Sequence, residues 1–136
     1  MLRQISVFLE NNFGRLGEVT RLLAKANINL RAISIADTAD FGILRIIADN
    51  NPTAITCLND AGFTIRETDV AAVEIEDKPG GLAKVMELFQ QSKVNIEYLY
   101  ASLNTTDKAI VIFKLEDHAK GLQILKEHGL STVEVF

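Results

Sequence analysis

Two short loops carry the residue types that could bind a small ligand. The first reads Glu10-Asn11-Asn12-Phe13-Gly14-Arg15-Leu16, and the second reads Glu76-Asp77-Lys78-Pro79-Gly80-Gly81-Leu82. Each loop follows a predicted strand and precedes an apolar pattern of helical spacing, so its glycines fall at a helix N-terminus. Backbone N–H groups there lack intrahelical partners and carry partial positive charge, and glycine lets a ligand approach them closely. The loops therefore predict two small carboxylate-binding sites.

An asparagine follows each loop, where the next strand is expected to begin. Asn29 and Asn95 hold this position, and Asn11 and Asp77 lie three residues before a glycine. We expect Asn29 to face Asn11 across the first loop and Asn95 to face Asp77 across the second. A side-chain amide or carboxylate there could accept hydrogen bonds from an α-ammonium while the helix N-terminus receives the α-carboxylate. This arrangement suits a free amino acid.

The same residues also have a purely structural interpretation. Asn11 or Asp77 could cap the helix, the glycines could serve only the turn, and Asn29 and Asn95 could satisfy local backbone groups. Residue types alone leave both interpretations open.

The elements that position these loops occur twice. At an offset of 66 residues the apolar, glycine and asparagine positions of the two halves coincide, as in Val7 and Val73, Gly14 and Gly80, Leu16 and Leu82, and Asn29 and Asn95. One extra residue, inserted in a loop near Asn50 and Glu116, then aligns Gly62 with Gly129. The chain is therefore expected to contain two domains, residues 1–69 and 70–136, with no flexible linker between them.

Each half has the predicted order βαββαβ. In the first half the expected elements are a strand at 4–10, a helix at 16–26, strands at 29–37 and 43–49 joined by a hairpin at 37–40, a helix opened by Pro52 and ended by Gly62, and a strand at 64–68. This order is typical of the ferredoxin-like fold of the α+β class. We expect two such modules, each an antiparallel four-stranded sheet with helices on one face.

Small size and apolar strands predict that the modules pair. Residues 43–47 and 109–113 are apolar almost throughout, whereas a sheet with one solvated face would alternate. A module of about 68 residues buries only about 60% of its unfolded surface. We expect the modules to meet edge to edge or face to face, and the whole chain to form a homodimer.

Composition excludes several partners. The 14 Lys and Arg against 18 Asp and Glu give a net charge of −4, too acidic for a nucleic-acid partner. No apolar run approaches a membrane span, and residues 1–10 do not resemble a signal peptide, so the sequence predicts a cytoplasmic protein with no membrane partner. The single Cys57 cannot form an intrachain disulfide.

Catalytic residue types are scarce. His118 and His128, both expected on a solvated face of the last helix, form no metal-ligand spacing with Cys57. His128, directly before Gly129, suits a helix C-terminus. No nucleophile elbow, zinc-protease motif, P-loop or dinucleotide fingerprint occurs. We therefore expect no enzymatic activity, no catalytic residue, no cofactor and no metal.

The loop Asp77-Lys78-Pro79-Gly80-Gly81-Leu82, a helix containing Val85, and Val94-Asn95-Ile96 opening a strand resemble the ACT domain, a βαββαβ module that binds amino acids and regulates metabolic enzymes. The two copies make the whole chain similar to a tandem ACT pair. The resemblance implies a ligand site at the loops near a module interface. The implied ligand-binding residues are Asn11, Phe13, Gly14, Arg15, Leu16, Asn29, Leu30, Asp77, Pro79, Gly80, Gly81, Leu82, Asn95 and Ile96.

Two positions depart from the ACT pattern. Phe13 replaces the proline of the first loop, where it could instead supply an aromatic wall for the ligand, and Asp77 stands where such sites often have asparagine. A carboxylate at Asp77 would attract an ammonium group and repel a nearby carboxylate. The resemblance thus implies an amino-acid sensor whose two sites differ in affinity.

Three alternatives stay open. Ile5 to Asn11, with Gly14 and Leu16, also resembles the start of the regulatory small subunit of acetolactate synthase, although that subunit has one ACT domain and a different second half. An RNA-binding module of this fold would need aromatic residues on the central strands, where Phe113 stands alone. An acylphosphatase-like enzyme would need an arginine in an anion-gripping loop, and Arg15 is available.

Overall fold

Two modules with the same order of elements make up the chain. The computed structural model describes residues 2–10, 12–37, 40–103 and 108–134. One compact unit is Arg3–Thr68, here called the N-terminal module, and the other combines Met1–Leu2 with Asp69–Phe136, here called the C-terminal module. The boundary between the two units therefore lies between Thr68 and Asp69.

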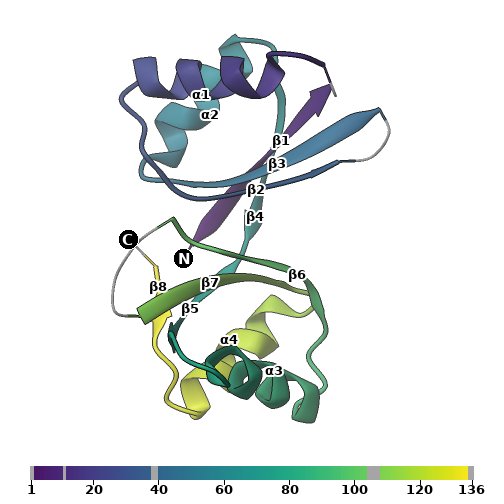
Figure 1. The fold of residues 1–136 in the computed structure, drawn as a ribbon, viewed down its shortest axis with the longest axis vertical. Helices are drawn as coiled ribbons and strands as arrows, with labels where there is room; N and C mark the ends of the chain where they lie inside the picture. Colours follow the sequence, from purple (N-terminus) through teal and green to yellow (C-terminus); the bar gives the residue numbers. More distant parts are fainter. Residues whose placement is uncertain (1, 11, 38–39, 104–107, 135–136) are drawn as a thin grey trace. The chain divides into compact units, whose positions relative to one another are not determined.

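The N-terminal module is a four-stranded sheet with two helices on one face (Figure 1). Its elements are β1 (Arg3–Glu10), α1 (Arg15–Lys25), β2 (Leu30–Asp37), β3 (Phe41–Ala48), α2 (Asn51–Asp60) and β4 (Thr64–Asp69). The sheet order is β2-β3-β1-β4, and β3 runs antiparallel to both β1 and β2.

The C-terminal module repeats this architecture. Its elements are β5 (Ala71–Glu76), α3 (Gly81–Gln91), β6 (Ile96–Ala101), β7 (Lys108–Leu115), α4 (His118–Glu127) and β8 (Thr132–Val133). The order β6-β7-β5-β8 is antiparallel at every pair and equivalent to that of the first sheet (Figure 1). The expected pair of ferredoxin-like βαββαβ modules of the α+β class is confirmed.

Alternation along the strands builds a separate core beneath each pair of helices. In the N-terminal module, Ile5 and Ile46 form a buried cross-strand pair that packs in the same core as Leu23 of α1. In the C-terminal module, Phe89 of α3 meets Phe113 of β7 edge to face, with ring centroids 5.4 Å apart. The apolar side chains whose spacing predicted the helices therefore face the sheets.

Local signals set the helix ends. Asn50 caps α2 by accepting a hydrogen bond from the Thr53 N–H at 3.2 Å. At the other end, Gly62 adopts φ 87° and the Phe63 N–H donates to the Leu58 carbonyl at 3.0 Å, which closes a Schellman motif. The predicted stop at Gly62 is confirmed. The hairpin expected at residues 37–40 includes positions 38 and 39, which lie outside the described residues.

The helix-free sheet faces also carry apolar residues. Ala72 and Ile112 form a cross-strand pair on the face opposite the core of the C-terminal module, and Phe8 and Ile43 pair on the corresponding face of the N-terminal module. Within the described part of the chain, no helix has both the length and the apolar character that crossing a membrane requires.

Candidate functional site

The β1–α1 and β5–α3 loops have the same backbone geometry. Gly14 at the N-cap of α1 has φ 87° and ψ −8°, and Gly80 at the N-cap of α3 has φ 88° and ψ −9°. In the second loop the Lys78 N–H donates to the Glu76 carbonyl at 2.9 Å, and the Gly81 N–H donates to the Lys78 carbonyl at 3.0 Å. The first loop makes the equivalent bonds at 2.8 and 3.3 Å. Left-handed backbone explains the glycine at both N-caps.

Neither of these helices is capped by a side chain in the described part of the chain. The Asp77 carboxylate therefore does not cap α3, and the structural interpretation of this residue is wrong; Asn11 lies outside the described residues. The first intrahelical bond of α3 comes from the Lys84 N–H to the Gly80 carbonyl at 3.2 Å. Amides in the preceding turn are the groups that can receive an anion at a helix N-terminus.

Side chains around the loops differ between the modules. Phe13 in the first loop and Pro79 in the second are exposed, and the equivalent Leu16 and Leu82 are exposed to nearly the same extent. Arg15 does not extend into solvent alone, because its guanidinium carbon lies 4.5 Å from the centroid of the Phe63 ring. Its Nη1 also pairs with the Glu18 carboxylate at 2.9 Å.

The second loop carries a local ion pair. Lys78 Nζ lies 2.5 Å from the Glu76 carboxylate. The hydrogen bond and charge of Lys78, with smaller contributions from Lys84 and Lys108, lower the pKa of Glu76. Glu76 is therefore held as a carboxylate beside the N-terminus of α3.

The asparagines lie at the opposite end of each sheet from the loops. In the C-terminal module Glu76, before the loop, pairs with Lys108, whereas Ile96, after Asn95, pairs with Leu115. Lys108 and Leu115 lie seven positions apart at the two ends of β7, or roughly 23 Å at the rise of an antiparallel strand. The expectation that Asn95 faces Asp77 across the same loop is therefore wrong.

The N-terminal module has the same separation. Glu10 pairs with Phe41, whereas Leu30, after Asn29, pairs with Ala48. The physical reason is the course of α1, which runs back along the sheet before β2 begins (Figure 1). The backbone N–H of Asn29 donates a hydrogen bond to the Asp49 carboxylate at 3.1 Å, and Asn29 is exposed. Ligand binding at Asn29 and Asn95 stays a prediction.

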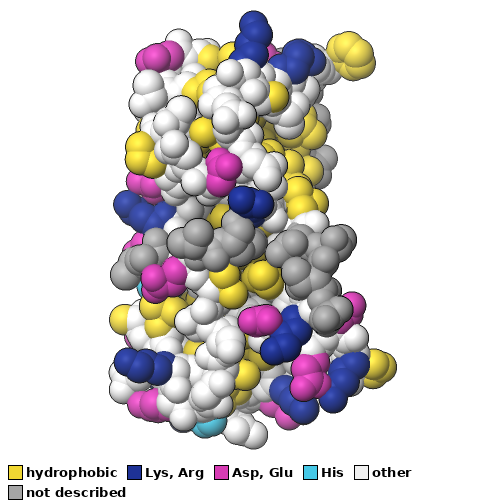
Figure 2. Space-filling view, turned by 90° about the vertical axis from the view of Figure 1, so that its left-hand side faces the viewer, with side chains coloured by type: hydrophobic (Ala, Val, Ile, Leu, Met, Phe, Trp, Pro, Cys, Tyr) yellow, Lys and Arg dark blue, Asp and Glu magenta, His cyan; other side chains and the backbone are white. Residues whose placement is uncertain are grey.

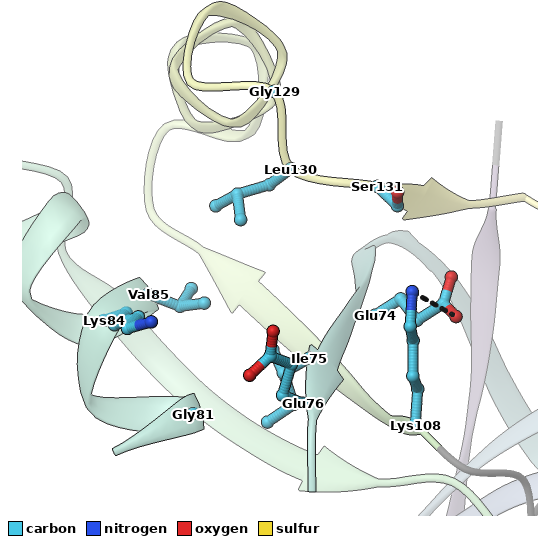
Figure 3. A pocket seen from close by; sticks show the side chains of 10 residues that line it. All are labelled: Glu74, Ile75, Glu76, Gly81, Lys84, Val85, Lys108, Gly129, Leu130 and Ser131. Atoms are coloured by element: carbon cyan, nitrogen blue, oxygen red, sulfur yellow. Dashed lines mark ion pairs between the residues drawn. The ribbon is translucent and has the colours of Figure 1, made fainter. Parts of the chain in front are cut away.

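A cavity of about 300 Å³, unforeseen in the sequence, lies between α3, β5 and the segment after α4 (Figure 3). Its wall includes Glu74, Glu76, Lys84, Val85, Lys108 and Leu130. The sequence carries a signal for this cavity, because the side chains at this place are larger in the first repeat than in the second. Arg15 and Phe63 of the first copy correspond to Gly81 and Leu130 of the second.

The two histidines differ. His128 is the C-cap of α4, with Nδ1 2.9 Å from the Ile124 carbonyl oxygen, as its position before Gly129 predicted. His118 at the start of α4 is only partly exposed, and both ring nitrogens are enclosed with no hydrogen-bond partner among the described residues. The expectation of a solvated His118 is therefore wrong. Burial lowers the pKa of His118.

No group of three potential metal ligands occurs in the described segments.

The fold and its two glycine-led loops define a tandem pair of ferredoxin-like modules. The family model for the ACT domain pair matches residues 1–135, and the chain belongs to this family. The resemblance found in the loops is thereby confirmed.

Solved structures agree with this assignment. A crystal structure of a protein from Bacteroides thetaiotaomicron has a TM-score of 0.92 and 41% identity over 97% of this chain and 91% of that chain. The ligand-free regulatory subunit of aspartate kinase from Thermus thermophilus has a TM-score of 0.67 and 18% identity, with 93% and 91% covered. Its counterpart from Thermus flavus has a TM-score of 0.64 and 18% identity, with 93% of each chain covered. At 18% identity, the likeness to the aspartate kinase subunits shows that they share the fold of this chain. A search of curated protein sequences finds no match.

Proposed function

We propose that this ACT domain pair is a non-catalytic regulatory protein that binds a free amino acid at its β1–α1 and β5–α3 loops. The observation that carries the proposal is a helix N-terminus that opens with a left-handed glycine in both copies and has no side-chain cap among the described residues. A side-chain cap would compete with a ligand for the first amides of the helix. Because the Gly81 N–H already bonds to the Lys78 carbonyl, the amides of Leu82 and Ala83 are the ones proposed to receive a carboxylate in the C-terminal module.

The ligand is proposed to lie between two modules. The α-carboxylate would meet the loop of one module, at Gly14 to Leu16 or Gly80 to Leu82. Because Asn29 and Asn95 lie at the far ends of their own sheets, they can reach such a ligand only from a different module. Binding would then change how modules associate, and a coupling free energy of a few kcal/mol suffices for regulation.

The two sites are expected to differ. Asp77 is exposed in the second loop, beside a Glu76 that is held ionised by Lys78. Two carboxylates favour the ammonium group of a ligand and disfavour a second acidic group. The two loops are therefore expected to bind the ligand with different affinities.

Thermal unfolding in the presence of each of the twenty amino acids tests the proposal. A ligand present at 100 times its dissociation constant stabilises the folded state by about 2.7 kcal/mol. Asn29→Ala and Asn95→Ala should each weaken binding at the sites to which they contribute, whereas Asn59→Ala, an exposed asparagine on α2, should not. If none of the twenty amino acids raises the unfolding temperature, the sensor function is contradicted. Unchanged binding in both variants removes only the assignment of the asparagines.

A second copy of the chain is the proposed partner. Phe8 and Phe41, both on the helix-free face of the sheet of the N-terminal module, are 40% and 57% exposed. Figure 2 shows hydrophobic side chains reaching the surface between charged ones. Exposed apolar side chains that lie together mark association surfaces. Sedimentation equilibrium should give a dimer, and Phe8→Ser with Phe41→Ser should shift it toward monomer.

A regulatory subunit of a biosynthetic enzyme is the second candidate. Two relatives in fold are named as regulatory subunits of aspartate kinase, and each is matched over more than 90% of its length. A subunit of the acetolactate synthase type is the other form of this candidate. Affinity purification followed by mass spectrometry distinguishes it, because it requires a stoichiometric catalytic subunit of an amino-acid biosynthetic enzyme.

A further inference from the structure

Phe13 holds an aromatic ring entirely in solvent, in the loop between β1 and α1. Its side chain is 108% exposed, the highest value among the large hydrophobic residues of the described segments. Moving such a ring out of water is strongly favourable. A single exposed apolar side chain does not by itself mark an interface, so the surface that could receive the ring decides its role.

The cavity beside α3 offers an apolar surface for a ring. Its volume is about 300 Å³, and Val85 and Leu130 form an apolar wall with Ile75 (Figure 3). Ile75 and Leu130 are only partly buried, so part of this wall is accessible. Leu82 and Ala83, whose amides are proposed to receive a carboxylate, do not line the cavity.

Comparison of the two modules shows that an aromatic ring fits this place. In the N-terminal module the equivalent space holds the Phe63 ring, which is 4% exposed beneath the Arg15 guanidinium. The C-terminal module has Leu130 and Gly81 at these positions. Gly81 cannot be replaced by a larger residue without movement, because a Cβ atom there would overlap the Glu76 carbonyl oxygen. The ring that fills the space in one copy of the repeat is therefore missing from the other.

The charges around the cavity leave one cation over. Glu76 is paired with Lys78, and Glu74 is paired with Lys108 at 3.7 Å. Lys84 lies on the wall and makes no ion pair within the described part of the chain. A partner that brings a carboxylate beside an apolar group would complement this wall.

The loop that carries Phe13 has this combination. Glu10 is exposed three residues before Phe13, and its carboxylate accepts a hydrogen bond from the Asn12 side chain at 2.9 Å. The nearby cation Arg15 is already paired with Glu18 at 2.9 Å. The loop therefore presents an aromatic ring with an acidic group next to it.

We infer that Phe13 of one copy of the chain docks in the cavity beside α3 of a second copy, with Glu10 of the docking loop facing Lys84. The contact joins unlike modules, because the ring belongs to the N-terminal module and the cavity to the C-terminal module. Each chain has one ring and one cavity, so two copies make the contact twice in a closed dimer. The inference rests on the proposed self-association of the chain and assigns to it a contact separate from the sheet face that carries Phe8 and Phe41.

A tryptophan in place of Phe13 reports on this contact. The sequence contains no tryptophan, so Phe13→Trp gives a single emitting ring. Its emission should move to shorter wavelength over the concentration range in which sedimentation shows dimer formation, because the ring leaves water. Leu130→Phe in the same chain should abolish this movement, whereas Leu103→Phe, at a position that is 58% exposed, should not. Emission that does not change with concentration overturns the inference.

Mixing two variants tests the pairing of ring and cavity directly. Phe13→Ser removes the ring and Leu130→Phe fills the cavity, and each alone should weaken association at least about tenfold in sedimentation equilibrium. An equal mixture should associate more strongly than either variant alone, because the intact ring of one meets the intact cavity of the other. Circular dichroism checks that both variants fold. A mixture that associates no more strongly than its components contradicts the contact.

A charge exchange tests the position of Glu10. Glu10→Lys and Lys84→Glu each place like charges together and should weaken association about threefold. The two changes in one chain restore an opposite pair and should recover most of the native affinity. Additive weakening in the double variant shows that these two side chains do not face each other.

All of these measurements are made without amino acids, so failure of the loop ligand sites does not affect them. The sheet face is separated in the same way. If Phe8→Ser with Phe41→Ser dissociates the chain and Phe13→Ser does not, the sheet face alone holds the dimer and the docking of Phe13 is overturned. If only Phe13→Ser dissociates it, the docking is supported and the sheet contact is contradicted.

Discussion

The guanidinium group of Arg15 lies over the ring of Phe63, with 4.5 Å between Cζ and the ring centroid. This contact joins the first residue of α1 to the residue that follows the C-terminal turn of α2. In the other module the same two positions hold Gly81 and Leu130, which line a cavity. One pair of substitutions between repeats therefore accounts for a filled space in one copy and an open one in the other.

Arg15→Ala should destabilise the N-terminal module by about 1 kcal/mol, since it removes a cation–π contact and a partly exposed ion pair with Glu18. Urea unfolding measures the change. Arg21→Ala, on the exposed side of the same helix, is the control and should alter the free energy of unfolding by less than about 0.5 kcal/mol. Equal effects of the two changes contradict a specific role for the Arg15–Phe63 contact.

Gly80→Ala should cost about 1 to 2 kcal/mol, because alanine must adopt a φ near 88°. No atom outside the chain neighbours lies within 4 Å of the added Cβ, so the cost isolates backbone conformation from steric overlap. Gly14→Ala should behave alike, and Gly17→Ala in the first turn of α1, where φ is not positive, should not destabilise the chain. Thermal and urea unfolding provide the comparison.

The helix caps give a matched pair of predictions. Asn50 accepts from the Thr53 N–H at 3.2 Å, and Asp117 accepts from the Lys120 N–H at 3.1 Å. Asn50→Ala and Asp117→Ala should each cost about 1 kcal/mol of unfolding free energy. The Asn59→Ala change on the surface of α2 removes no cap and serves as the reference; if it costs as much as Asn50→Ala, the capping bond contributes nothing.

His118 should make stability depend on pH below about 6.5, its ordinary pKa. Burial lowers the pKa of His118 in the folded state and Lys114 adds to this, while Asp69 opposes it. The neutral ring is thus favoured by folding, so the contribution is fully present above the unfolded pKa and is lost as the pH falls through the folded pKa. On acidification from about pH 7.5 to 5.5, His118→Gln should lose less unfolding free energy than the native chain. An identical loss in both proteins would show that His118 is already solvated.

Much of the fold followed from local physics. The repeat, the strand alternation and the glycine at the end of α2 all act over a few residues, so one sequence suffices to recognise them. The position of Asn95 required one more step. A helix that returns along its sheet places the start of the next strand far from the preceding loop, and this follows from the element order alone.

The cavity and His118 could not be predicted in the same way. The cavity exists because the small Gly81 and Leu130 leave space between α3, β5 and the segment after α4. Only tertiary packing brings these three parts of the chain together. The enclosure of His118 likewise depends on residues distant in the chain, including Leu2 and Val133, which line a small recess with it. Periodicity within α4 gives no information on such neighbours.

The Val70 N–H donates to the carbonyl of Leu2 at 3.2 Å, within a unit that joins both ends of the chain. During synthesis the N-terminal residues emerge first, yet their partner is made only after the whole N-terminal module. At about 5 to 20 residues per second, that delay is several seconds, long enough for the N-terminal module to fold. The contact of Leu2 with its own unit therefore forms only after the whole N-terminal module has been made.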